Sequence, residues 1–176
     1  PEEWWTSNYI NLMTGHAQNV SRSTDAQEGT YSVKLVADTT ILDTDTATLA
    51  FATTKGAPFD GLVPSFQYKK VPQMLTGYYK YSATVDTAAF GISFQKDSTY
   101  NQEFVAELLP SATWKKFVID LSVLGNKVQW DSIALFMTTS IKIVEEGDLT
   151  AAEKGTVLYI DNIQLIDKDW SGPCND

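Results

Sequence analysis

The stretch Gly155-Thr-Val-Leu-Tyr-Ile-Asp-Asn-Ile-Gln-Leu-Ile166 carries apolar side chains at alternate positions, as a β-strand with one buried face does. Near the start of the sequence, Gly29-Thr-Tyr-Ser-Val-Lys-Leu-Val36 has the same form, a glycine turn followed by alternating apolar residues. Such strands at both ends favour a domain that closes by bringing its ends together. Helical periodicity is nearly absent from the rest of the sequence.

Runs of period two recur along the chain and are separated by turn residues. They cover Tyr31–Val36, Ala47–Thr53, Met74–Thr84, Phe90–Lys96, Phe104–Leu109, Trp114–Leu121, Ser132–Thr138 and Thr156–Ile166. This spacing predicts an all-β fold, a two-sheet antiparallel β-sandwich (jelly roll) of about 8–10 strands. Because no Pro-rich or Ser-rich linker interrupts it, we expect one domain over residues 1–170 and a C-terminal tail over 171–176.

Strand parity divides the side chains of the second half of Met74–Thr84 between two faces. Tyr79 and Tyr81 share the face predicted to be buried. Tyr78 and Lys80 share the other, which we expect to meet solvent because an unpaired buried ammonium group would be costly. By the same rule the predicted core includes Phe90, Ile92, Phe94, Phe117, Ile119 and Leu121, whereas Gly91, Ser93 and Gln95 face outward.

The closing strand breaks its own alternation. Leu158 and Ile160 have one parity, whereas Ile163 and Leu165 have the other. If all four side chains are buried, the strand needs one extra residue, most simply a β-bulge at residues 161–162. Such a bulge would turn the carboxylate of Asp161 sideways, where it could serve as a ligand or as a turn cap.

Composition excludes several classes of function. The 176-residue chain has a net charge of −9, with twelve lysines and the single arginine Arg22, so nucleic-acid binding is not indicated. No apolar run approaches the roughly 18 residues of a membrane span. The single histidine, His16, and single cysteine, Cys174, exclude an internal disulfide and His-rich or Cys-rich zinc sites. A Ser-His-Asp triad would have to use His16, and the Gly-x-Ser-x-Gly elbow is absent.

Several motifs together resemble a known family. They are Pro1-Glu-Glu-Trp-Trp5-Thr-Ser-Asn8, Glu28-Gly-Thr-Tyr-Ser-Val-Lys-Leu35, Pro72-Gln-Met-Leu-Thr-Gly-Tyr-Tyr-Lys-Tyr81, Trp114-Lys-Lys-Phe-Val-Ile-Asp120 and Leu158-Tyr-Ile-Asp-Asn-Ile-Gln-Leu165. In this order the sequence resembles the jelly-roll carbohydrate-binding modules, the galactose-binding-like sandwiches, and most nearly a carbohydrate-metabolism domain family of Bacteroidota. The resemblance implies a non-catalytic module that binds an oligo- or polysaccharide. It also implies a secreted or cell-surface location, as a monomeric part of a larger multidomain protein.

Sugar sites in such folds combine aromatic faces with nearby polar side chains. Candidate ligand residues are Tyr78, Lys80, Gln95 and Glu107, on outward faces of three strands that could be neighbours, and Trp5, Tyr68, Tyr100 and Trp130 in loops or turns. Trp4 and Trp114 are expected instead to close the ends of the sandwich. The alternative for the strand tyrosines is that aromatic side chains simply suit a pleated surface.

A structural calcium ion needs oxygen ligands from loops. Asp161, Asp25 and Glu28 could supply them if the closing strand lies beside the turn that precedes Tyr31. The alternative is that Asp161 caps the bulge and Glu28 is solvated. Family members often have Asp-Asp where this chain has Asp-Asn, and often begin with a further strand whose glutamate can help to hold the ion.

Two other functions stay open. The same sandwich could be a protein-interaction or adhesion module, with the long connection from Lys55 to Val71 as its contact surface. It could also be a small glycan-active hydrolase, for which Glu107 is the acidic residue that lies in an apolar strand.

Overall fold

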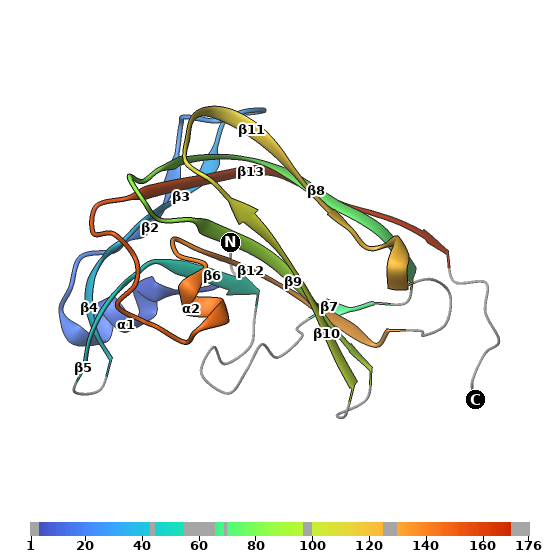
Figure 1. Ribbon diagram of the computed structural model, residues 1–176, viewed down its shortest axis with the longest axis horizontal. Helices are drawn as coiled ribbons and strands as arrows, with labels where there is room; N and C mark the ends of the chain where they lie inside the picture. Colours follow the sequence, from blue (N-terminus) through green and yellow to red (C-terminus); the bar gives the residue numbers. More distant parts are fainter. Residues whose placement is uncertain are drawn as a thin grey trace.

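The computed structural model describes residues 4–42, 45–54, 66–68, 70–96, 100–124 and 130–169, and at residues 40–42, 45, 66, 100, 168 and 169 it describes the backbone alone. Two large antiparallel sheets stack as a sandwich, which confirms the predicted fold class (Figure 1). The segments 55–65 and 171–176, with the greater part of the expected long connection and Cys174, lie outside the described residues.

Sheet A contains six strands. Its order is β1 (Trp4–Thr6), β6 (Phe51–Thr54), β12 (Ser132–Thr138), β9 (Ala88–Lys96) and β10 (Tyr100–Leu108), with β7 (Phe66–Gln67) also paired to β12. Sheet B has the order β11 (Ser111–Asp120), β8 (Lys70–Ser82), β13 (Val157–Asp169), β3 (Ser32–Val36) and β2 (Val20–Ser23). A hairpin of β4 (Asp38–Leu42) and β5 (Asp45–Leu49), the helices α1 (Ser7–Thr14) and α2 (Lys142–Glu145), and the 3-10 turn η1 (Ser122–Leu124) complete the described elements.

The last strand lies beside a strand from the first quarter of the chain. β13 lies between β8 and β3 and pairs with both in antiparallel register. The two stretches quoted from near the start and the end of the sequence therefore lie side by side. It fixes the centre of sheet B, where Leu158 and Ile160 are buried against the core.

The core follows the predicted parity. Phe90, Ile92 and Phe94 are fully buried on the inner face of sheet A. On the facing side the ring of Phe117 lies over Gly77, and a Cβ at that glycine would stand 2.6 Å from the ring. The glycine thus makes room for an aromatic side chain that meets Phe90 with 5.0 Å between ring centroids.

The outer face of sheet A is more covered than its parity alone predicts. Gly91 and Ser93 point away from the core, as expected, but both are buried. At Gly91 the reason is the ring of Phe136 on the neighbouring strand, because a Cβ there would come within 2.1 Å of that ring. Parity gives the direction of a side chain, whereas coverage depends on the size of its cross-strand neighbours.

α1 was not expected from the sequence. The amide of Asn8 ties it to β2: the side-chain oxygen accepts the backbone N–H groups of Asn19 (2.8 Å) and Val20 (2.9 Å), and the nitrogen donates to the Val20 carbonyl (2.6 Å). The helix ends at Gly15, whose φ of 75° is one that glycine adopts readily. Long-range hydrogen bonds thus hold a helix of only eight residues.

The bulge at residues 161–162 is confirmed. The pairing of β13 with β8 shifts between Asp161 and Gln164, and Asn162 has a positive φ of 48°. The Asp161 carboxylate accepts the backbone N–H groups of Gln27 (2.7 Å) and Glu28 (3.0 Å), and also that of Asn162 (2.8 Å). The Asp161 carboxylate thus caps these N–H groups and fixes the loop between β2 and β3.

Candidate functional site

Tyr78 and Lys80 point outward from sheet B, as predicted, and both are partly exposed. Gln95 and Glu107 lie on β9 and β10 of sheet A, so the expected cluster of three neighbouring strands is wrong. β8 and β9 follow each other along the chain but belong to different sheets. The two pairs of side chains therefore lie on opposite outer faces of the sandwich.

Aromatic and basic side chains gather on the outer face of sheet B. Trp114 of β11 meets Tyr159 of β13 edge to face, with 6.4 Å between ring centroids. The ammonium group of Lys80 lies 5.2 Å from each centroid. Trp114 was expected to close an end of the sandwich, but it lies instead on this open face, because residues 111–120 form the outermost strand of sheet B.

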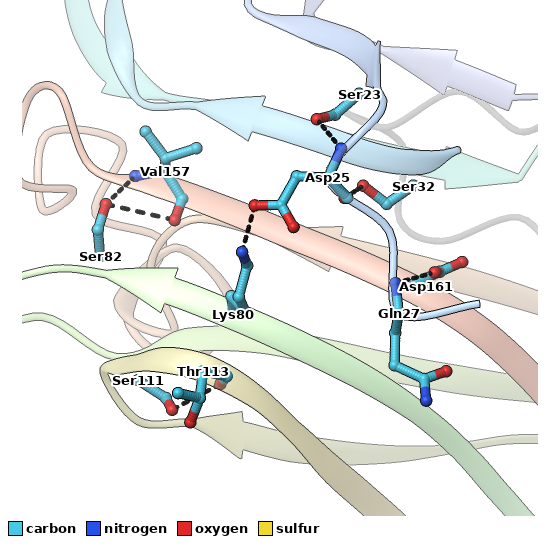
Figure 2. Close-up of polar contacts among 10 residues, drawn as sticks. All are labelled: Ser23, Asp25, Gln27, Ser32, Lys80, Ser82, Ser111, Thr113, Val157 and Asp161. Atoms are coloured by element: carbon cyan, nitrogen blue, oxygen red, sulfur yellow. Dashed lines mark hydrogen bonds and ion pairs between the residues drawn. The ribbon is translucent and has the colours of Figure 1, made fainter. Parts of the chain in front are cut away.

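A loop over residues 24–31 crosses the edge of the same face. Asp25 of this loop forms an ion pair with Lys80, which reaches from β8 across β13 (Figure 2). The Lys80 side chain is only 19% exposed, so the pair is partly shielded from solvent. The ion pair and the Asp161 cap hold the loop at two points.

Two aromatic candidates are buried. Trp130 was expected to be exposed in a turn, but it is 1% exposed and its ring packs 5.4 Å from that of Phe94. Tyr68 is 6% exposed and contacts the same phenylalanine edge to face. A surface-binding role is therefore wrong for both residues, because their rings belong to the core between the sheets.

The remaining aromatic candidates lie on sheet A. Trp5 is partly exposed, stacks on Phe51 at 5.7 Å and meets Tyr9 at 5.3 Å. Tyr100 begins β10, and its side chain lies outside the described residues. The strands that carry these residues, β1 and β10, belong to sheet A, whereas the aromatic face belongs to sheet B.

A groove of about 710 Å³ lies between the edge strands of the two sheets, β1 of sheet A and β2 of sheet B. We call it the edge groove. Its lining comprises Trp4, Thr6, Asn8, Val20, Ser21, Arg22, Tyr31, Ser32, Val33, Ile160, Asp161, Asn162 and Ile163. Its floor is apolar, and the bulge of β13 supplies part of its polar rim.

Arg22 explains why this edge stays open. It pairs with Val33, which pairs in turn with the buried Ile160, so Arg22 lies on the core-facing side of β2. A guanidinium group cannot be sealed into apolar packing without a partner. Instead it lies 4.4 Å from the centroid of Tyr31, which is 47% exposed, and the groove keeps both groups in contact with solvent.

Arg22 and Tyr31 were not predicted as site residues from the sequence. The available signals were that Arg22 is the single arginine of the chain and that Tyr31 follows the Gly29 turn. Trp4, expected to plug an end of the sandwich, does pack against the core, but it also lines the groove.

The three carboxylates suggested for calcium lie near one another but have other partners. Asp161 caps backbone N–H groups, Asp25 pairs with Lys80, and Glu28 accepts a hydrogen bond from the Asn162 amide. Within the described ranges, no group of three His, Cys, Asp or Glu side chains is placed to hold a metal ion. Calcium binding stays a prediction that depends on these residues exchanging partners.

Acidic residues on β10 bear on the hydrolase alternative. Glu103 and Glu107 are both exposed on the outer face of sheet A, and partial desolvation by neighbouring groups raises the pKa of the Glu103 carboxyl. Four residues along a strand place their backbones about 14 Å apart. The two carboxyl groups of a glycosidase usually lie about 5–9.5 Å apart, so this pair does not match that geometry.

Comparison with solved structures identifies similar folds. TmCBM61 in complex with beta-1,4-galactotriose aligns over 94% of this chain and 88% of its own, with a TM-score of 0.50 and 11% identity. A family 30 carbohydrate-binding module aligns over 88% and 85%, with a TM-score of 0.51 and 11% identity. The fold is similar to that of carbohydrate-binding modules.

A third structure, the glycoside hydrolase domain of Endo-D from Streptococcus pneumoniae R6, aligns over 92% of this chain but only 21% of its own, with a TM-score of 0.48 and 15% identity. No family model matches the chain, and the search of curated proteins gives no match. None of the helices in the described ranges is long and apolar enough to cross a membrane.

Proposed function

We propose that this protein is a non-catalytic module that binds an oligo- or polysaccharide in the edge groove. The observation that carries the proposal is the groove itself, about 710 Å³ in volume, with an apolar floor and a polar rim. Concave sites of this size with a few polar groups are typical for small organic ligands. The similarity of the fold to carbohydrate-binding modules supports the same choice of ligand.

The groove offers the two kinds of contact that a sugar needs. The rings of Trp4 and Tyr31 can pack on the apolar face of a pyranose. Arg22 and the Asn162 amide can form hydrogen bonds with hydroxyl groups. Asp161 is already held by three backbone N–H groups, so its main contribution is to keep the rim in place.

The expected setting is a secreted or cell-surface protein in which this domain assists a glycan-handling machinery. A domain that holds the glycan without cleaving it needs no pair of closely spaced carboxyl groups. In this proposal Glu107 is a solvated surface residue. Binding and hydrolysis are separated by an assay for new reducing ends, run on the parent protein and on Glu107→Gln. Turnover by the parent that is lost in the variant would contradict a non-catalytic role.

Isothermal titration of the full chain against a panel of neutral oligosaccharides tests the proposal. Trp4→Ala and Tyr31→Ala should each weaken binding about tenfold or more, because each removes a ring contact from the groove. Tyr9→Ala is the matched control, since Tyr9 is 54% exposed on α1 and does not line the groove. A panel with no bound member, or equal losses in all three variants, would contradict the proposal.

A second candidate is a protein-interaction module. α1 exposes Tyr9, Leu12 (74%) and Met13 (72%), which follow one another at helical spacing and form an apolar surface. Leu12→Ser with Met13→Ser should leave glycan binding unchanged. If this pair of substitutions abolished association with a protein partner of the parent molecule, the interaction module would be favoured.

A further inference from the structure

A row of side chains crosses the outer face of sheet B, away from the edge groove. Lys80 of β8 and Lys34 of β3 are the cross-strand partners of Tyr159 on β13, and Trp114 of β11 contacts Lys80 from the other side. We call these four residues the lysine strip. In the next row, Lys116 pairs with Tyr78 and extends the basic face.

The charges of the lysine strip are only partly balanced. The ammonium groups of Lys34 and Lys80 lie 5.9 Å and 5.2 Å from the Tyr159 centroid, on a chain whose net charge is −9. Lys80 has Asp25 as its partner. Lys34 and Lys116 form no ion pair with the residues that the structure describes. A carboxylate from outside would supply the missing counter-charge.

We propose that the lysine strip binds an acidic polysaccharide whose uronate carboxylate pairs with Lys34. A pyranose ring of the same chain packs against the exposed parts of Trp114 and Tyr159, which contribute aromatic surface on either side of Lys80. This second site is separate from the edge groove, because the loop over residues 24–31, held by Asp25 and Asp161, lies between them.

The spacing of the strip fits a polymer. Lys34 and Lys80 lie on strands separated by one intervening strand, so their backbones are about 9.6 Å apart. This distance is comparable with the length of a disaccharide unit, so a uronate paired with Lys34 leaves the neighbouring sugars over the aromatic surface beside Lys80. A phosphate polyanion such as DNA fits less well, because its binding needs a longer basic stripe and is opposed by the acidic remainder of the chain.

The test titrates the full chain with an oligogalacturonate and with a neutral oligosaccharide of the same length, at low salt and at 0.5 M NaCl. We expect the acidic ligand to bind more tightly and to weaken with salt, as exposed ion pairs do. Lys34→Gln should weaken its binding about fivefold, the effect of one partly exposed ion pair. Trp114→Ala should also weaken it, whereas Lys142→Gln removes one charge from α2 and should not.

Trp4→Ala separates the two sites. It should weaken binding of neutral sugar in the edge groove about tenfold or more and leave the acidic ligand unaffected, so either proposal can fail alone. Equal affinities for the acidic and neutral ligands would overturn the inference about the lysine strip. So would equal effects of Lys34→Gln and Lys142→Gln, or binding of single-stranded DNA or of anionic lipid vesicles as tight as that of the oligogalacturonate.

Discussion

Replacing Asp161 by alanine removes the carboxylate that holds the loop over residues 24–31. Its oxygens accept three backbone N–H groups, and two of these, from Gln27 and Glu28, lie more than 130 positions away in the sequence. A hydrogen bond to a charged group contributes about 1.5–3 kcal/mol when shielded and less when exposed. Because this site is partly exposed, we expect Asp161→Ala to lower the free energy of unfolding by about 2–3 kcal/mol in total.

Asp161→Asn should lose less, about 1 kcal/mol, because the amide oxygen can still accept the two N–H groups of the loop as neutral hydrogen bonds. Urea unfolding measures both values, with an unchanged m-value as evidence that only stability has altered. Amide hydrogen exchange should show faster opening at Gln27 and Glu28. Asp148→Ala is the control, since among the described residues that carboxylate forms hydrogen bonds only with Thr150, two residues away. A loss no larger than that of the control, or unchanged exchange in the loop, would refute the assignment of Asp161 as the loop's anchor.

Four further variants test the packing and the charges of the sandwich. Tyr81→Phe should lower the free energy of unfolding by about 1–2 kcal/mol, because it removes a buried 2.6 Å hydrogen bond to the Thr139 carbonyl. Tyr68→Phe should be neutral or stabilising, because the buried Tyr68 hydroxyl has no hydrogen-bond partner among the described residues. Urea unfolding compares the two variants. Gly91→Ala should lower stability by about 3 kcal/mol in thermal unfolding, because its Cβ would overlap the ring on the neighbouring strand, and a loss below about 0.5 kcal/mol would contradict that packing. Partial desolvation raises the pKa of Glu103, so its contribution to stability is greatest at acidic pH and falls as pH rises from the ordinary glutamate pKa through the raised one. Glu103→Gln should therefore gain stability relative to the parent over that window, and parallel pH profiles would count against it.

The sequence was sufficient to predict which way the strand side chains point. In β8 the alternation places Tyr79 and Tyr81 inside and Tyr78 and Lys80 outside, and the structure agrees. The parity break in the closing strand also located the bulge to within two residues. Both results follow from the fixed period of a β-strand, which is a local property of the chain.

The sequence did not predict which strands pair or which segments pack together. Gln95 was grouped with Tyr78 and Lys80 as residues on the outward faces of strands that could be neighbours, but sheet membership is set by contacts between distant residues. Trp130 was placed in an exposed turn, yet the next residue donates its N–H group to the Gln95 carbonyl and so draws the tryptophan against β9 and into the core. Similarly, α1 is held by Asn8 rather than by a pattern of apolar residues, so its periodicity gave no signal.

The bulge links these local and long-range features. A regular strand would turn Asp161 and Asn162 to opposite faces of sheet B. With the extra residue and a positive φ at Asn162, both side chains reach the same loop, Asp161 by accepting its N–H groups and Asn162 by donating to Glu28. On the other side of the loop, Asp25 binds Lys80. The bulge in β13 therefore fixes a loop that serves both surfaces: Tyr31 of this loop lines the edge groove, and Asp25 supplies a counter-charge to the lysine strip. A change at the bulge should alter both surfaces together.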